Sequence, residues 1–282
     1  MITDRETNFL YLADCLPEKY PALFDKFQRV LNEVGIPFDF LPNTKDIWTV
    51  DYMPIQVSKD RFVQFRYEPD YLMGTPEDKA TISNVDTICQ AIGIKPIKSN
   101  INLDGGNITK WKDKVILCDK VFHENPQLTE DELFEELMEY LNIKEENLKF
   151  VPEDELDFTG HSDGMLRFIN ANTVLINDYS KEDSEFKVLF QEAIDSTGLE
   201  VIVLPYEPEN DPYLISAVGL YLNYLEMEQA VIIPVFNKPS DDKAVRILED
   251  VFQGKTIRTV ESADLARKGG GILNCFSWNI LT

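Results

Sequence analysis

The sequence is short of histidine, of basic residues and of long apolar runs. Its 282 residues include only two His and four Cys, and 27 Lys and Arg against 50 Asp and Glu give a formal net charge of −23 at pH 7. This charge argues against a nucleic-acid partner, because contacts with phosphates need clustered Lys and Arg. It also argues against docking on anionic membranes. A small cationic ligand is favoured instead.

Segments that would carry the chain into or across a membrane are also missing. No stretch approaches the roughly 20 apolar residues of a spanning helix, and residues 1–5 lack the basic region and following apolar run of a signal peptide. The four Cys contain no CxxC pair, so they are expected to be reduced thiols of a cytoplasmic protein. With two His and scattered Cys, no His/Cys zinc site is expected.

What the sequence does contain is a repeated pattern of helix, strand and hairpin. Five segments have apolar residues at three- and four-residue steps and are predicted to be amphipathic helices, namely 17–34, 76–92, 129–142, 181–197 and 240–253. Each ends at a residue suited to the left-handed conformation of a helix C-cap, namely Gly35, Gly93, Asn142, Gly198 and Gly254. A short strand-like run follows each end, and a predicted hairpin follows four of these runs.

The pattern amounts to about five β-α-β-β units of an α/β fold. The fifth unit is cut short, because the C-terminal segment GGGILNCFSWNILT supplies a single strand. We expect the N-terminal run NFLYLAD to supply the missing partner strand and to close the circle. No unit could bury its sheet face alone, so residues 1–282 are predicted to form a single domain.

Unusual polar residues occur at equivalent points of these repeats. One stands in each repeat, at spacings of 52 to 62 residues: Asp51, Asp104, His161, Asn223 and Cys275. If the repeats surround a common axis, these side chains converge there. Each also has an ordinary structural interpretation. Taken alone, Cys275 between apolar neighbours is best interpreted as core, and Asp104 with the two glycines that follow it as a turn.

Together these residue types favour one kind of chemistry. A thiol nucleophile needs a proton shuttle, and His161 is one of only two candidates. The alternation of His161 and Asp163 is typical of a strand, which would direct both side chains to one face. Carboxylates at one site favour a planar cation such as guanidinium, whereas they would oppose the oxyanion of a protease. Attack on a guanidinium carbon is therefore favoured over proteolysis. Arg167 is expected to make a structural pair with a carboxylate.

The same segments resemble a known family. The blocks of the agmatine deiminase and bacterial-type peptidylarginine deiminase family are matched in order by DIWTVDYMP, LDGGN, GHSDGMLRF, LYLNYLE and GGGILNC. This family belongs to the guanidino-group modifying superfamily, and the similarity runs from about residue 46 to the C-terminus. It implies the pentein fold, a five-bladed α/β propeller of five ββαβ repeats around a pseudo-fivefold axis.

The resemblance also implies roles for the matching positions. Cys275 matches the nucleophile, His161 the general acid/base, and Asp104 a partner of His161. Asp51 and Asp163 match the carboxylates that grip the guanidinium group. Further substrate-binding positions are matched by Asn223, Trp48, Asn107 and Gly270.

The implied activity is hydrolysis of a guanidino substrate, such as agmatine or peptidyl-arginine, to a ureido product and ammonia through a thiouronium intermediate on Cys275. No metal or organic cofactor is implied, and a homodimer would fit the family. Two positions depart from the family's pattern: Val50 stands where Arg usually precedes Asp51, and Asn274 where His usually precedes the Cys. Two alternatives stay open, an amidinotransferase and, because of these departures, a catalytically silent propeller that acts as a binding protein.

Overall fold

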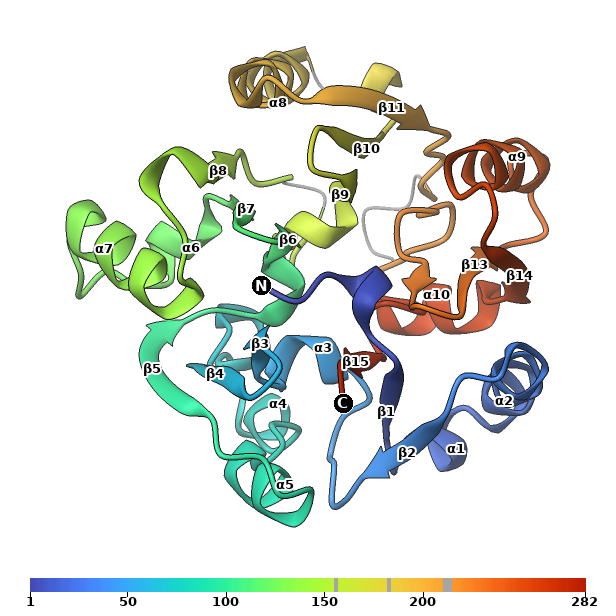
Figure 1. Ribbon diagram of the computed structural model, residues 1–282, viewed down its shortest axis with the longest axis horizontal. Coiled ribbons are helices and arrows are strands. Elements are labelled where there is room, and N and C mark those ends of the chain that lie inside the picture. Colours follow the sequence, from blue (N-terminus) through green and yellow to red (C-terminus); the bar gives the residue numbers. More distant parts are fainter. Residues whose placement is uncertain (155–156, 182–183, 210–214) are drawn as a thin grey trace.

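The computed structural model describes residues 1–154, 157–181, 184–209 and 215–282. Five small sheets of three strands lie around a common centre, with the longer helices on the outside (Figure 1). In every sheet a middle strand pairs antiparallel with an inner strand and parallel with an outer strand. The parallel pair requires a crossover connection, which a helix provides each time.

The strands fall into three classes by their place in the sheets. The inner strands are β3 (Ile55–Ser58), β6 (Thr109–Trp111), β9 (Leu166–Asn170), β12 (Leu225–Glu226) and β15 (Trp278–Ile280). The middle strands are β1 (Phe9–Ala13), β4 (Arg61–Arg66), β7 (Lys114–Cys118), β10 (Thr173–Asn177) and β13 (Ala230–Val235). The outer strands are β2 (Phe38–Leu41), β5 (Ile97–Asn102), β8 (Leu148–Val151), β11 (Glu200–Leu204) and β14 (Thr256–Glu261).

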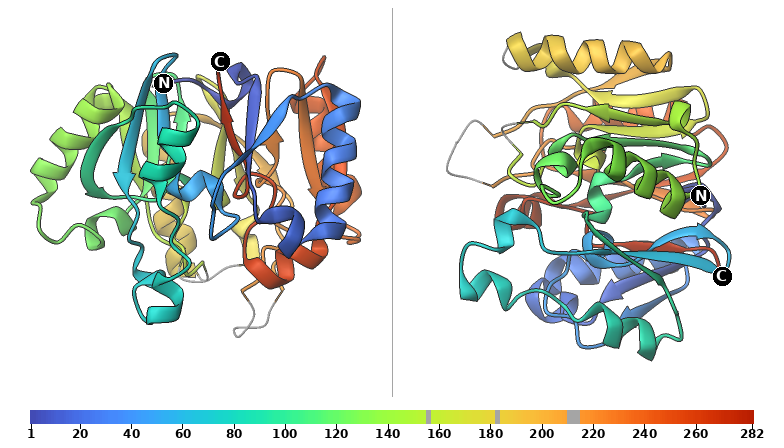
Figure 2. Two further views of the ribbon diagram at one scale, coloured as in Figure 1. Left: turned by 90° about the horizontal axis from the view of Figure 1, so that it is seen from below. Right: turned by 90° about the vertical axis from the view of Figure 1, so that its left-hand side faces the viewer.

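One sheet is completed by the two ends of the chain. The N-terminal strand β1 pairs antiparallel with the C-terminal strand β15 and parallel with β2. This confirms the prediction that NFLYLAD supplies the missing partner strand. Both ends of the chain consequently lie on the same side of the molecule, near its centre (Figures 1 and 2).

The crossover helices end within two residues of the predicted ends. They are α2 (Pro21–Val34), α5 (Val85–Ala91), α7 (Glu130–Leu141), α8 (Ser184–Thr197) and α9 (Asp241–Val251). All five predicted C-cap residues have a positive φ, between 54° and 88°. The apolar steps also fall on the inward face, as in α2, which buries Leu23, Phe24, Phe27 and Leu31.

Two predicted helices are wrong in extent, because each is divided. The segment 17–34 contains α1 (Leu16–Lys19) and then α2, since Pro21 lacks an amide proton and so begins a helix more readily than it continues one. The segment 76–92 contains α4 (Pro76–Lys79) and then α5. Asn84 is the N-cap of α5, and its side chain accepts a hydrogen bond from the amide of Thr87. In the segment 181–197, residues 182–183 lie outside the described part, and α8 follows from residue 184.

The sequence analysis missed several short helices. Three are α-helical, namely α3 (Thr49–Tyr52), α6 (Lys120–His123) and α10 (Ala263–Gly269). Six are single 3₁₀ turns, namely η1 (Asp4–Glu6), η2 (Asp70–Leu72), η3 (Gly105–Asn107), η4 (Glu145–Asn147), η5 (Ser162–Gly164) and η6 (Tyr179–Lys181). Segments this short have too few residues to show a hydrophobic period.

The apolar core lies between the sheets and their helices, whereas the centre of the molecule is polar. Four apolar clusters contain nearly all the large buried side chains. Buried polar side chains include Asp51, Asp104, His161, Asp163 and Asn223, each at most 7% exposed. Along the described ranges, no helix is both long and apolar enough to cross a membrane. The fold therefore gathers polar groups at a desolvated centre, where electrostatic interactions are strong.

Candidate active site

The predicted polar residues occupy equivalent places in the five sheets. Each stands two to five residues before an inner strand: Asp51 before β3, Asp104 before β6, His161 before β9, Asn223 before β12 and Cys275 before β15. Because the inner strands surround the centre, the five segments that precede them meet there (Figure 1). Residues that lie about one repeat apart in the sequence therefore precede the inner strands of successive sheets.

Most of the predicted site residues line one cavity of about 130 Å³. These are Trp48, Asp51, His161, Asp163, Asn223, Gly270 and Cys275. Asp104 lies directly behind His161 and contacts it. Asn107 does not line this cavity: its side chain exchanges hydrogen bonds with the backbone of Cys118 (2.6 and 3.3 Å), which fixes the turn after Asp104 to strand β7. The structure thus brings together every predicted residue except Asn107.

His161 lies between two carboxylates. Its Nε2 is 2.8 Å from Oδ2 of Asp104, and its Nδ1 is 3.6 Å from Oδ1 of Asp51. The close approach depends on Gly106, where a Cβ atom would lie 2.5 Å from His161 Nδ1 and 2.6 Å from Asp51 Oδ1. The amide of Gly106 donates to Asp51 (3.2 Å). The two glycines after Asp104 are therefore more than a turn, since the second leaves room for His161 and Asp51 to approach each other.

The surrounding charges set the protonation state of His161. Burial alone would lower the pKa of the imidazole, but the charge of Asp51 and the hydrogen bond and charge of Asp104 outweigh this and raise the pKa to about 10. At neutral pH the ring is therefore an imidazolium, and it can donate a proton to a leaving group. Burial in turn raises the pKa of Asp51 well above its usual value, and the charge of His161 opposes that increase.

Cys275 is held by Asn223. The Asn223 Nδ2 donates to Cys275 Sγ at 3.0 Å, and its Oδ1 accepts from the amides of Asn274 (2.9 Å) and Cys275 (3.3 Å). Burial raises the pKa of the thiol well above its ordinary value, and the charges of Asp163 and Asp51 raise it further, although the hydrogen bond from Asn223 acts in the opposite direction. In the empty cavity the thiol is therefore protonated at neutral pH.

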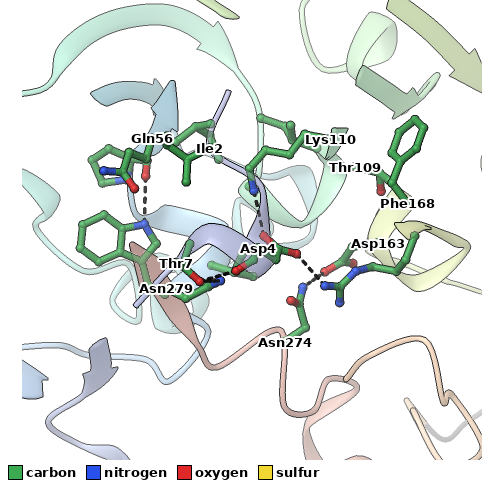
Figure 3. A pocket seen from close by; sticks show the side chains of 17 residues that line it. Ile2, Asp4, Thr7, Gln56, Thr109, Lys110, Asp163, Phe168, Asn274 and Asn279 are labelled. Carbon is green, nitrogen blue, oxygen red and sulfur yellow. Dashed lines mark hydrogen bonds and ion pairs between the residues drawn. The ribbon is translucent and has the colours of Figure 1, made fainter. Parts of the chain in front are cut away.

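Asn274, the residue before Cys275, contacts the carboxylate of Asp163. Asn274 Nδ2 donates to Asp163 Oδ2 at 2.6 Å, and Figure 3 shows the two side chains directed at each other. They also line a second, smaller cavity of about 60 Å³ on the far side of Asp163. There Asp4 accepts from Lys110 (3.1 Å) and from Arg167 (2.6 Å), which confirms the expected structural pair of Arg167 with a carboxylate. Asp163 thus separates the two cavities.

One local prediction is wrong. His161 and Asp163 were expected to alternate along a strand, but residues 162–164 form the 3₁₀ turn η5 and the strand β9 begins only at Leu166. The amide of Gly164 bonds back to the carbonyl of His161 (3.2 Å), which closes the turn. The two side chains still border the same cavity, because the turn lies against its wall.

Several cavity residues carry no signal in the sequence. The lining also includes Asp46, Tyr67, Tyr71, Leu72, Asp157, Phe158, Thr159 and Leu220. Asp46 and Leu220 stand at the first positions of the segments DIWTVDYMP and LYLNYLE. The others follow the β3–β4 hairpin or precede η5, and no motif marks them. One feature that could have drawn attention is the aromatic pair Tyr67 and Tyr71, four residues apart, of which Tyr71 lies in η2. Aromatic walls of this kind suit the apolar stem of a cationic ligand.

The charge of the cavity is one-sided. Among the described residues that line it, Asp46, Asp51, Asp157 and Asp163 are acidic, and none is Lys or Arg. Within those parts of the chain, no group of three His, Cys, Asp or Glu is arranged to hold a metal ion. The cavity therefore combines a thiol, an imidazolium and several carboxylates, and it favours a cationic organic ligand.

Comparison with known proteins adds a family. Residues 22–280 match the family model described as Porphyromonas-type peptidyl-arginine deiminase. A curated relative from Mycoplasma mycoides subsp. mycoides, named "Putative agmatine deiminase", is 23% identical over 225 residues, which are 67% of this chain and 60% of that protein. The match thus spans less than two thirds of that relative's own length.

Solved structures share the fold. The agmatine deiminase of C. jejuni superposes with a TM-score of 0.80 at 18% identity, covering 100% of this chain and 95% of that one. DDAH from Pseudomonas aeruginosa, solved as a Cys-to-Ser mutant with citrulline, superposes with a TM-score of 0.57 at 14% identity, covering 97% and 99%. At these identities the likeness concerns the fold alone.

Proposed function

The chain belongs to the Porphyromonas-type peptidyl-arginine deiminase family, and from this premise we propose that it hydrolyses a guanidino group to a ureido group and ammonia. One observation supports the proposal most strongly. Cys275, His161 and the carboxylates Asp51 and Asp163 border one buried cavity with no Lys or Arg among its described lining residues. This arrangement can bind a guanidinium cation and place its carbon beside a sulfur nucleophile.

The proposed reaction has two halves. In the first, the Cys275 thiolate forms a C–S bond with the guanidinium carbon, one C–N bond breaks, and His161 gives its proton to the nitrogen that leaves as ammonia. In the second, neutral His161 takes a proton from water, which attacks the same carbon. The C–S bond then breaks and returns the thiolate, while the ureido product leaves. Asp104 holds Nε2 of His161 throughout, and the carboxylates orient the planar cation by paired hydrogen bonds.

Binding of the substrate is proposed to activate the thiol. In the empty cavity the pKa of Cys275 is raised, first by burial and then by the charges of Asp163 and Asp51. A guanidinium ion bound between these carboxylates would neutralise their effect and would itself favour the thiolate, with the thiol proton passing to water because His161 already carries its own. The reaction therefore needs the cation in place before the nucleophile forms, which limits side reactions of the free thiol.

The cavity favours agmatine over free arginine. The α-carboxylate of arginine would find no Lys or Arg among the described lining residues. A primary ammonium at the far end of the substrate would instead meet Asp46 or Asp157, and the methylene stem would lie against the aromatic rings of Trp48 and Tyr71. We propose a substrate with a guanidinium at one end and no anionic group at the other.

Further properties belong to the same proposal. The ββαβ topology of the five sheets and their arrangement around a centre support an α/β propeller with pseudo-fivefold symmetry. We also propose that the whole chain is a single catalytic domain. The cytoplasmic location and the homodimer stay predictions.

The proposal is tested by incubation of the protein with agmatine, arginine and an arginine peptide, with ammonia and ureido product assayed separately. Agmatine is expected to give equal amounts of both, and Cys275→Ala to give neither. An added amine acceptor separates hydrolysis from amidino transfer, since transfer would yield a new guanidine in place of the ureido product. Labelling of Cys275 by an amidine-type inactivator without turnover of any guanidine would favour the silent binding protein.

A further inference from the structure

Lys120 is a buried cation close to the candidate active site. Lys120, in α6, has a side chain only 5% exposed. Its Nζ lies 2.8 Å from Oδ1 of Asp70 and donates to the carbonyls of Phe158 (3.2 Å) and Thr159 (3.0 Å). A buried ammonium needs such partners, because desolvation of an unpaired charge is costly.

The groups that Lys120 contacts come from two separate segments of the cavity wall. Asp70 begins η2, whose next residue, Tyr71, lines the cavity; Phe158 and Thr159 lie in the connection that leads to His161 and line it as well. One ammonium group therefore ties together two walls that are almost 90 residues apart in the sequence.

Tyr71 links this ammonium to the acid–base pair. Lys120 Nζ lies 5.0 Å from the centroid of the Tyr71 ring, within the range of a cation–π contact. The Tyr71 hydroxyl donates to Oδ2 of Asp104 at 2.8 Å, and the same oxygen is 2.8 Å from Nε2 of His161. Burial and the charge of Asp104 raise the pKa of Tyr71 well above its ordinary value, so the hydroxyl keeps its proton and remains a donor.

The backbone before His161 is also shaped by this side chain. Gly160 has a φ of +62°, and a Cβ atom there would lie 2.6 Å from Cδ of Lys120. The lysine stem thus packs directly against the residue that precedes His161. Around the ammonium itself stand four carboxylates whose charges act on it or respond to it, namely Asp70, Asp104, Glu124 and Glu153.

We propose that Lys120 is a positioning residue for the reaction: it holds Tyr71 on Asp104 and the 158–160 segment beside His161, so that the imidazolium is aligned before the substrate arrives. The inference rests on the proposed deiminase function for its kinetic consequence. Its structural part, the coupling of Lys120 to His161 through Tyr71, does not depend on catalytic turnover. Lys120 and Tyr71 act on the reacting atoms only through Asp104 and His161.

A double-mutant cycle tests the proposal. Lys120→Met keeps the apolar stem and removes the charge, whereas Tyr71→Phe removes only the hydroxyl, which bonds Asp104 and Tyr67. We expect Lys120→Met to lower kcat/KM by roughly 10- to 100-fold, as misplacement of a catalytic group does, and Tyr71→Phe by roughly 5-fold, as loss of one hydrogen bond does. If Lys120 acts through Tyr71, the double variant is no slower than Lys120→Met by more than about 2-fold.

Lys255 provides a matched control. Its side chain is 21% exposed, its Nζ donates to the carbonyl of Met227 (2.7 Å) and lies 3.5 Å from Glu226, and it does not line the cavity. Lys255→Met should leave kcat/KM within about 2-fold of wild type, and its effect should add to that of Tyr71→Phe. Independent, additive effects of Lys120→Met and Tyr71→Phe would overturn the proposal.

An observation that needs no turnover separates this proposal from the proposed function. The chain has only two His, so His161 is identified in a histidine-labelled NMR spectrum by the loss of the other signal in His123→Gln. Lys120→Met should displace the His161 ring signals, Tyr71→Phe should add little to that displacement, and Lys255→Met should cause none. Unchanged signals in Lys120→Met overturn the positioning role even in an active enzyme. The full pattern in a protein that consumes no guanidine upholds the role and refutes the deiminase. If Lys120→Met fails to fold, Lys120→Gln, which keeps a hydrogen-bond donor, is judged by the same criteria.

Discussion

Replacement of Asp51 by Asn would change the charge next to His161 with little change in shape. The Asp51 carboxylate lies 3.6 Å from Nδ1 of the ring. At an effective dielectric constant of about 20, two unit charges at this distance attract by about 4–5 kcal/mol, which corresponds to roughly 3 pH units. Burial raises the pKa of Asp51 itself, so it is charged over only part of the range. The pKa of His161, about 10 in the native protein, should therefore fall by between about 1 and 3 pH units in Asp51→Asn.

The assay is an NMR titration of the His161 ring between about pH 5 and 11, a range that covers the ordinary pKa of histidine and the raised one. Asp46→Asn is the matched control, because Asp46 also lines the cavity but is not among the charges that set the His161 pKa. It should leave the titration unchanged. A His161 pKa that is near its ordinary value in the wild type, or that stays within about half a unit in Asp51→Asn, would refute the electrostatic reasoning.

Three further predictions concern the same centre. Asn223→Ala should lower stability by roughly 1–3 kcal/mol, because it leaves the buried amide of Cys275 and the thiol without their partner, while the amide of Asn274 keeps only its bond to the Asn223 carbonyl (3.3 Å); chemical denaturation against Asn172→Ala, an exposed turn residue, measures this, and an equal effect of both would contradict it. Alkylation of Cys275 should be slow at neutral pH and should accelerate toward alkaline pH, because burial raises the thiol pKa; fast alkylation at neutral pH in the empty protein would be inconsistent with a protonated thiol. The unfolding free energy should fall by roughly 2–4 kcal/mol as the pH rises from about 6.5 to about 10, because the unfolded chain loses the His161 proton first while the folded one keeps it; in Asp51→Asn this decrease should be smaller, and a flat profile in the wild type would argue against the raised pKa.

Much of the fold could be predicted because the same physical signals recur in each repeat. Five amphipathic segments each end at a residue that tolerates a left-handed backbone, such as Gly198 or Asn142, and these ends proved to be left-handed. The pairing of β1 with β15 could be predicted because an incomplete last unit leaves an unpaired strand. The prediction was wrong about the continuity of two helices. Pro21 and Asn84 each begin a new helix inside a segment whose apolar period runs on.

The candidate site divides in the same way. Residues at equivalent points of the repeat, such as His161 and Cys275, could be predicted to lie together, because equivalent points of repeats arranged around an axis meet at the centre. Asn107 fits a motif but serves the backbone of Cys118, a distinction that only the three-dimensional position of its amide makes. Lys120 could not be found, and Tyr71 carries only the signal of its aromatic pairing with Tyr67, because neither lies in a motif. Their importance comes from long-range contacts, which no local pattern in the chain records.

The most direct test of the central claim is the fate of agmatine in water labelled with heavy oxygen. The proposed mechanism predicts that wild-type protein releases ammonia together with an equal amount of a ureido product, and that the oxygen of this product comes from the labelled water. It also predicts that Cys275→Ala yields neither. A folded wild-type protein that releases no ammonia from agmatine or from any arginine compound between about pH 6 and 10, a range that spans the thiolate and imidazolium titrations, would contradict it.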